Sequence, residues 1–174
     1  MFNPNPPTGD LSPAESFDPL EFGDLFDENG FGLGFFAAIA IAADNVDLFF
    51  DGYKLEQSKA HALMQRFYAN IELNTSPFIA GTGPAQFVGE DDVFSSPSNI
   101  RILGPGTIGR ASHHGIHGNN NKNVVISGLT FEDFEVAAVS LNNVDSLEIS
   151  NNHIHGNRKD VPVTGIFSAA RFIR

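Results

Sequence analysis

The sequence predicts an all-β solenoid, in which short parallel strands stack turn upon turn. A four-residue pattern recurs four times: a polar turn residue, an apolar residue, a variable residue and a second apolar residue. A further apolar residue follows each copy five to seven positions later. The last three copies lie 24 and 23 residues apart, and a period in the twenties is typical of stacked folds. The copies are Asn45–Leu48, Asn99–Ile102, Asn123–Ile126 and Ser146–Ile149, followed by Leu55, Ile108, Phe131 and Ile154.

The composition suits such a fold. The chain has 174 residues, about the length of one domain, and 41% of them are hydrophobic. Seventeen Gly and ten Pro supply turns, and seventeen Phe with two Tyr and no Trp indicate packing by plain hydrophobic side chains. The absence of Cys excludes disulfides and thiolate metal sites.

The net charge of −11 is concentrated at the N-terminus, because residues 1–56 carry −10 and residues 57–174 carry −1. Neither part is a basic surface, so the sequence predicts no nucleic-acid partner. Residues 1–36 are predicted to form an acidic disordered tail or an N-terminal cap. They lack the basic start and apolar run of a signal peptide, and the longest mostly apolar stretch, residues 31–43, is too short for a membrane span.

The β domain is predicted to span residues 37–174, with the first turn at 37–55, where alternation of small and apolar residues indicates a strand. Residues 56–98 interrupt the repeat. Apolar residues at helical spacing within this insertion predict a helix around residues 58–69, with Ser58 as its N-cap. The chain ends on what looks like the opening of another turn, which predicts a domain truncated at its C-terminus.

From Asn99 onward the turns are compact, and alignment adds a third short strand to each of them. This third strand is expected at residues 115–120, 138–143 and 165–168. Asparagines fall in register at the corner that follows, where Asn tolerates left-handed backbone and can hydrogen-bond along the stack. The pairs are Asn119 with Asn142 and Asn120 with Asn143.

Several segments resemble a known family. Residues 39–55 are similar to the first coil of the right-handed parallel β-helix proteins of the pectin-lyase-like superfamily, and Gly104-Pro105-Gly106-Thr107-Ile108 resembles their G-x-G-T-I turn. Residues 123–131 and 146–154 resemble later coils. The resemblance implies a single-stranded right-handed parallel β-helix, an extracellular or surface location and a polysaccharide partner. It selects no activity, because the superfamily includes lyases, hydrolases, epimerases, phage tailspikes and adhesins.

Two histidines and a carboxylate form the candidate catalytic site. If Ile154 points inward, His153 and His155 face outward, and Glu132 occupies the column of His155 one turn earlier. At the strand spacing of about 5 Å, a carboxylate raises the pKa of an imidazole and orients its ring. Acid–base catalysis, metal binding and a merely exposed polar ladder are the three interpretations, and the ladder is the simplest.

The candidate substrate-binding residues are His117, Arg110, Glu135, Arg158 and Lys159. His117 is expected to face outward beside an inward Ile116, with Ser140 in its column. Calcium is the cofactor that the resemblance implies, although the sequence shows no clear set of calcium ligands and none of the diagnostic catalytic strings of the superfamily.

Two functions of different classes follow from these observations. The first is a carbohydrate-associated β-helix enzyme, a polysaccharide lyase, hydrolase or epimerase acting on extended glycans. The alternative is a non-catalytic β-helix module of the adhesin, stalk or tail-fibre type, which binds glycan or is purely structural. The absence of Trp leaves few side chains for stacking on sugars, and the oligomeric state is not determined by the sequence.

Overall fold

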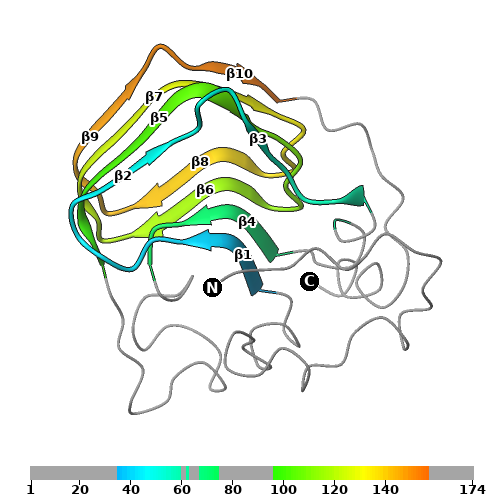
Figure 1. Ribbon diagram of the computed structural model, residues 1–174. Helices are drawn as coiled ribbons and strands as arrows, with labels where there is room; N and C mark the ends of the chain where they lie inside the picture. Colours follow the sequence, from blue (N-terminus) through cyan, green and yellow to red (C-terminus); the bar gives the residue numbers. More distant parts are fainter. Residues whose placement is uncertain (1–34, 60–61, 63–66, 75–95, 157–174) are drawn as a thin grey trace, which may run out of the picture.

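The computed structural model describes residues 35–59, 62, 67–74 and 96–156, which form strands in two parallel sheets (Figure 1). The first sheet has the order β1-β4-β6-β8 and the second β10-β7-β5-β2, with β3 also paired to β5 and β9 to β7. The strands are β1 (Phe35–Ala40), β2 (Val46–Phe49), β3 (Lys54–Leu55), β4 (Phe67–Glu72), β5 (Ser98–Ile108), β6 (His114–Asn119), β7 (Lys122–Glu132), β8 (Ala137–Asn142), β9 (Asp145–Ser150) and β10 (His153–His155).

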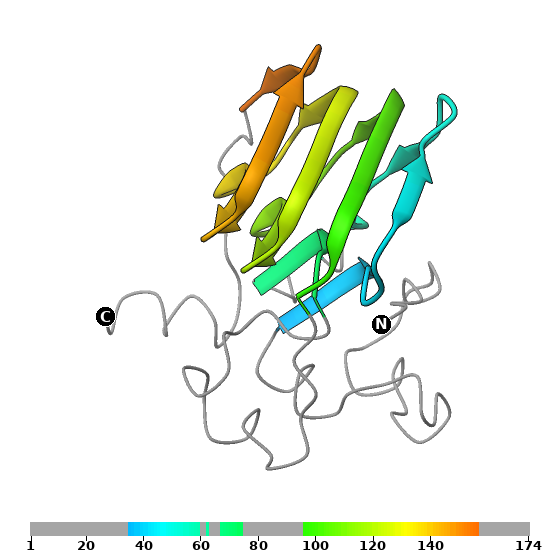
Figure 2. The same ribbon diagram turned by 90° about the vertical axis from the view of Figure 1, so that its left-hand side faces the viewer.

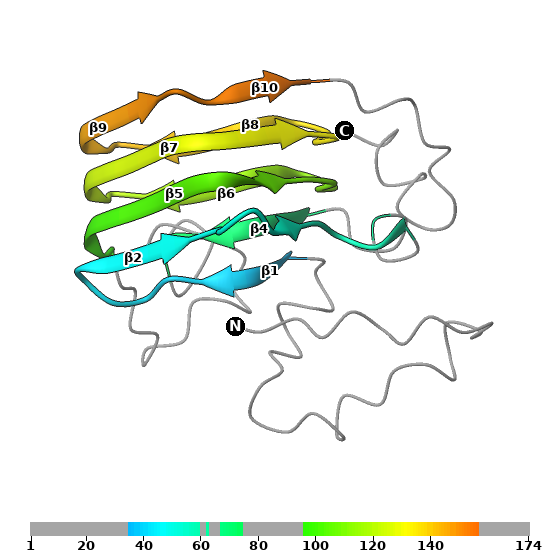
Figure 3. The same cartoon turned by 45° about the horizontal axis from the view of Figure 1, so that its top comes forward.

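The chain alternates between the two sheets, so each strand pairs with strands one passage earlier and later (Figure 3). Thus β5 in the second sheet leads to β6 in the first, and the chain returns to β7, which lies parallel to β5. Figure 2 shows the resulting stack of strands from its side. The predicted all-β architecture with parallel strands is confirmed.

The register of the second sheet matches the sequence repeat. Val46 pairs with Ile100, Ile100 with Val124, and Val124 with Leu147. The later apolar position is aligned as well, because Leu55, Ile108, Phe131 and Ile154 follow one another across the strands. The repeats therefore add strands to the sheet in the same register, either as one long strand (β5 or β7) or as two short ones (β2 with β3, and β9 with β10).

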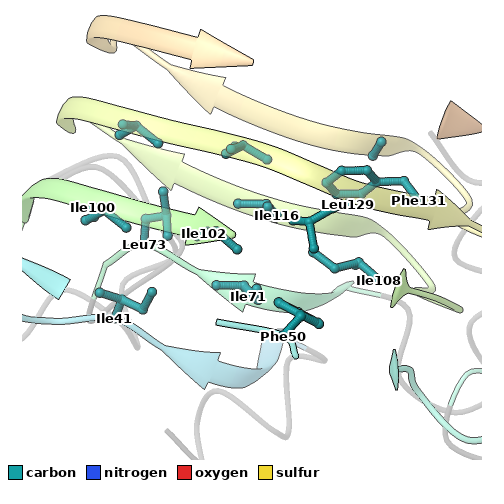
Figure 4. Close-up of a cluster of buried hydrophobic side chains, with 13 residues drawn as sticks. Ile41, Phe50, Ile71, Leu73, Ile100, Ile102, Ile108, Ile116, Leu129 and Phe131 are labelled. Carbon is teal, nitrogen blue, oxygen red and sulfur yellow. The ribbon is translucent and has the colours of Figure 1, made fainter. Parts of the chain in front are cut away.

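Apolar side chains from both sheets form one core between them (Figure 4). Ile71 and Ile116 of the first sheet pack with Ile102 and Phe131 of the second, and all four are 0% exposed. On β9 and β10, the outermost strands of the second sheet among the described residues, the same columns end in side chains that are 41–52% exposed, namely Leu147, Ile149 and Ile154. Burial of a repeat position thus requires a stacked neighbour on both sides.

Two expectations about local structure are wrong. Lys59 and Ala62 have helical backbone, but residues 67–69 of the predicted helix belong to strand β4, and the described residues contain no complete helix. Pairing of β4 with β1 and β6 outweighs the helical spacing of its apolar residues. In addition, the first two strands expected in a compact turn are continuous in β5 and in β7, although β9 and β10 are separate as expected. All of these strands belong to one sheet, so the described turns contribute to two sheets rather than three.

Asparagines line the corners of the stack, as predicted. Asn45, Asn99 and Asn123 have φ of 60°, 58° and 51°, and their side-chain amides are linked in series, with Asn123 Nδ2 donating to Asn99 Oδ1 at 2.8 Å. At a second corner, Asn142 Nδ2 donates to Asn119 Oδ1 and Asn143 Nδ2 to Asn120 Oδ1, both at 2.8 Å. Asn120 and Asn143 also have left-handed backbone, with φ of 58° and 54°, whereas Asn119 and Asn142 end strands β6 and β8. The corner asparagines thus suit left-handed backbone and need no catalytic explanation.

Replacement of Asn123 by Ala is expected to lower the free energy of unfolding by roughly 1–2 kcal/mol, because a Cβ-bearing residue without a polar side chain is strained in the left-handed region. Urea denaturation measures this loss. Asn123→Gly removes the same amide but tolerates the φ of 51°, so it should lose less. An equal loss in both variants would assign the effect to the hydrogen bond instead.

Candidate functional site

A network of five charged side chains lies on the outer face of the second sheet, the face turned away from the core. Lys54 Nζ contacts Glu132 Oε1 at 2.7 Å and Glu56 Oε2 at 2.9 Å. Arg110 contacts Asp133 Oδ2 at 3.0 Å and Glu56 Oε2 at 3.9 Å. This charged network links the ends of β3, β5 and β7.

The bridge from Lys54 to Glu132 passes over a glycine. Lys54 is on β3 and Glu132 on β7, with β5 between them, and a Cβ at Gly109, just after β5, would clash with Lys54 Cε and the side chain of Glu56. Gly109 therefore leaves the room that the lysine side chain needs to reach across one strand. Apart from the pair Lys54–Glu56, the ion pairs of the network join residues that are distant in sequence but adjacent in the stack.

The network shifts the pKa values of its members in the directions expected for paired charges. Hydrogen bonds from Lys54 to Glu132 and Glu56 raise the pKa of Lys54, against desolvation. At Glu56 desolvation favours the neutral carboxyl, but the hydrogen bond and charge of Lys54, together with Arg110, outweigh it and lower the pKa of Glu56. Lys54 and Glu56 are therefore both charged near neutral pH.

The predicted columns of Glu132, His153 and His155 are present. His155 pairs in register with Glu132 and His153 with Thr130. The two imidazoles are exposed, and their ring centroids lie 3.9 Å apart in an edge-on arrangement. The carboxylate of Glu132, however, is held by Lys54, a partner that the repeat pattern does not indicate.

The predicted substrate-binding residues fall in different places. Arg110 is in the charged network, with its side chain 18% exposed and Nη1 donating to the Gln57 carbonyl at 2.9 Å. Glu135 is half-buried in the turn after β7, where its backbone N–H donates to the Ala111 carbonyl. Arg158 and Lys159 lie outside the described residues, as does the third strand expected at 165–168.

His117 belongs to a second group on the outer face of the first sheet, which we call the histidine cluster: Glu72, His113, His114 and His117. Nδ1 of His117 lies 2.7 Å from Glu72 Oε2. The ring of His117 stacks on that of His114 at a centroid distance of 5.2 Å and an angle of 9°, and His113 is 3.8 Å from His114. Strand pairing of β4 with β6 creates this cluster, since Glu72 and His117 are partners in register.

Burial shifts the pKa values of two members of the cluster, Glu72 and His114. Glu72 is 4% exposed, and desolvation raises the pKa of its carboxyl although His117 opposes the shift. Its second oxygen, Oε1, is buried and has no hydrogen-bond partner among the described residues. Desolvation, aided by His113 and His117, lowers the pKa of His114 to about 3, so the His114 ring is neutral at physiological pH.

This shift gives a pH-dependent stability with a defined sign. The ordinary histidine pKa is 6.5 and the folded value about 3, so the stability contribution is complete above pH 6.5 and is lost as the pH falls toward 3. Between pH 6.5 and 4.5, we expect the free energy of unfolding of wild type to fall by on the order of 1 kcal/mol more than that of His114→Gln. This figure allows for solvent screening of the partly exposed ring. Urea denaturation of both proteins at both pH values measures this difference. Equal losses of stability in wild type and His114→Gln would contradict the role of His114.

Among the described residues, no three or more His, Asp or Glu side chains are arranged to hold a metal ion, and no helix is long and apolar enough to cross a membrane. Comparison with protein-family models, curated proteins and solved structures finds no match to this chain. The charged network and the histidine cluster therefore rest on their own geometry.

Proposed function

We propose that this chain is a carbohydrate-associated right-handed parallel β-helix of the pectin-lyase-like type, which holds an extended glycan along the outer face of β3, β5, β7 and β10. In-register parallel strands from successive passages support the β-helix. The general preference of parallel crossovers for one hand supports its right-handedness. The similarity of residues 39–55 and 104–108 to the superfamily supports the carbohydrate partner.

One observation carries the choice of face. A column of polar side chains runs in register across four parallel strands, and a second column beside it contains Glu132 and His155. Successive strands are spaced by about 4.8 Å, so the columns offer hydrogen-bonding groups at regular intervals along a flat surface. Regularly spaced hydroxyls of an extended glycan are complementary to such an array, and the charged members make the stronger hydrogen bonds. The first column is Lys54, Thr107, Thr130 and His153.

Catalysis on this face would use Glu132, His153 and His155 as acid and base, in a lyase, hydrolase or epimerase. The second candidate is a non-catalytic module, and one contact favours it. Glu132 Oε1 already accepts a hydrogen bond from the Lys54 ammonium at 2.7 Å, so a substrate proton would have to compete with this donor for the oxygen. The same contact leaves glycan binding unaffected, since a paired carboxylate still accepts hydrogen bonds from hydroxyls.

Affinity electrophoresis of the full chain in gels containing neutral or uronate polysaccharides tests this proposal. We expect retardation by at least one polymer and about a tenfold weaker affinity in a His153→Ala/His155→Ala variant, through loss of hydrogen bonds worth roughly 1 kcal/mol or more. Asp47→Asn is the matched control, because it alters an exposed ion pair with Arg101 on β2 and β5, outside both columns. Binding to no polysaccharide, or unchanged affinity in the double variant, would overturn the proposal.

The same protein separates the two candidates. Release of new reducing ends or unsaturated sugars from a bound polymer, lost in Glu132→Gln, would establish the catalytic form. Binding without any such product would establish the non-catalytic module. Glu132→Gln keeps the size of the side chain, so its folding is checked by the same urea transition as wild type.

A further inference from the structure

We infer that Glu72, His117 and Ser140 form a second site, on the opposite sheet from the charged network, that hydrolyses carboxylic esters with Ser140 as the nucleophile. The three residues occupy one column on three adjacent strands. Glu72 of β4 pairs in register with His117 of β6, which pairs with Ser140 of β8. Carboxylate, imidazole and hydroxyl thus follow one another at the strand spacing of about 4.8 Å.

Glu72 fixes the orientation of the histidine ring. When the Nδ1–H of His117 donates to Glu72 Oε2, at 2.7 Å, the other ring nitrogen, Nε2, is left as a proton acceptor. Glu72 is buried, so the contact between Oε2 and Nδ1 holds the imidazole in one orientation with little competition from water. Glu72 is therefore a positioning residue, and His117 is the general base.

The neighbouring histidine does not oppose this role. His114 stacks on His117 at 5.2 Å, and a protonated ring there would repel an imidazolium. The low pKa of His114, about 3, keeps its ring neutral, so it places no positive charge beside His117. Oε1 of Glu72 is buried without a hydrogen-bond partner among the described residues, and a catalytic role is one of the reasons for which such rare unpaired acceptors are kept.

Ser140 is accessible to a substrate. It is half-buried, and β8 is the outermost strand of the first sheet among the described residues. Val139, just before Ser140, pairs with the core residue Ile116, and the preceding position on the face of Ser140 is Ala138, a small side chain. A nucleophile, a base in the adjacent position and a third group that orients the base are the elements of a hydroxyl-based acyl transfer site, whatever their order along the chain.

The reaction balances with water as the only co-reactant. Ser140 Oγ attacks the carbonyl carbon of the ester while His117 Nε2 takes the hydroxyl proton. The tetrahedral intermediate expels the alcohol, which receives that proton from His117, and leaves an acyl group on Ser140. Water then attacks the acyl group with His117 as base, which releases the carboxylic acid and returns the proton to Ser140. Acyl groups on sugar hydroxyls are the expected substrates, a choice that rests on the proposed function.

The test uses the full chain with two small probes, p-nitrophenyl acetate and a fluorophosphonate, so it does not depend on glycan binding. We expect the fluorophosphonate to label Ser140, as located by mass spectrometry, and ester hydrolysis to fall at least a hundredfold in Ser140→Ala and His117→Gln. Ser150→Ala is the matched control, because its hydroxyl lies beside Ser127 and Glu148, away from any histidine cluster member. Glu72→Gln should shift the pH profile of hydrolysis, whereas a structural role would leave the profile unchanged.

Absence of label on Ser140, or equal hydrolysis by wild type and Ser140→Ala, would overturn the inference even if the chain binds glycans. Conversely, Ser140-dependent hydrolysis in a chain that binds no polysaccharide would support this site and reject the proposed glycan face. Ser140→Cys keeps a nucleophile of similar size. If iodoacetamide alkylates this thiol faster than the thiol of a Ser150→Cys variant, His117 activates position 140, and the result does not depend on a loss of folding.

Discussion

Replacement of Gly104 by Ala is expected to abolish cooperative folding or to cost about 4 kcal/mol or more. A Cβ on Gly104 would overlap the backbone carbonyl of Gly128 on the next strand. Because the obstructing atoms are backbone, no side-chain rotation relieves the overlap, and β5 and β7 must separate at the centre of the sheet. Urea denaturation, or expression in soluble form where no transition remains, measures the effect.

Gly128→Ala is the matched control for this prediction. Its φ of 74° strains a Cβ-bearing residue, but the nearest atom to the new Cβ is 3.6 Å away, an ordinary contact. We expect a loss of roughly 1–2 kcal/mol from backbone strain alone. Equal losses at the two positions would mean that the close approach of β5 and β7 is not a requirement of the fold.

Phe131→Ala is expected to lower the free energy of unfolding by about 3–5 kcal/mol, because it removes a fully buried aromatic ring and leaves a cavity. Phe131 is among the largest fully buried side chains and lies in the column that begins with Leu55 and Ile108. A total stability of about 5–15 kcal/mol is usual for a domain, so this variant will be marginal. Chemical denaturation at 25 °C gives the value.

Ile154→Ala tests the same column one strand further along. Ile154 pairs with Phe131 but is 52% exposed. Its truncation should cost less than about 1 kcal/mol, since little apolar area is lost from the core. A loss as large as that of Phe131→Ala would contradict the finding that a repeat position is buried only between two stacked neighbours.

The repeat pattern predicted much of the fold. Apolar positions such as Ile102 and Ile126 recur at a fixed interval, and in-register pairing of parallel strands translates that interval directly into columns. The corner asparagines were predictable for the same reason. The helix was not, because Phe67–Ala69 carry apolar residues compatible with either period, and only pairing with β1 and β6 selects the strand.

The candidate sites were less predictable because their contacts cross long separations in sequence. His155 and Glu132 belong to consecutive repeats, so their register could be foreseen. Lys54 reaches Glu132 across an entire intervening strand, which only the missing side chain of Gly109 permits. Glu72 lies within the segment assigned to an insertion, so its pairing with His117, 45 residues later, was not anticipated.

In-register parallel stacking is the claim on which both sites depend, and cysteine cross-linking tests it most directly, since the natural chain has no cysteine. Val125 and Glu148 are partners on β7 and β9 and face outward. Their Cα atoms should be about 4.8 Å apart, within the range of a disulfide. Val125→Cys/Glu148→Cys should form an intramolecular disulfide on mild oxidation, and Val125→Cys/Ser150→Cys, two residues out of register, should remain reduced. Cross-linking of the offset pair in preference to the aligned pair would contradict the stacked register.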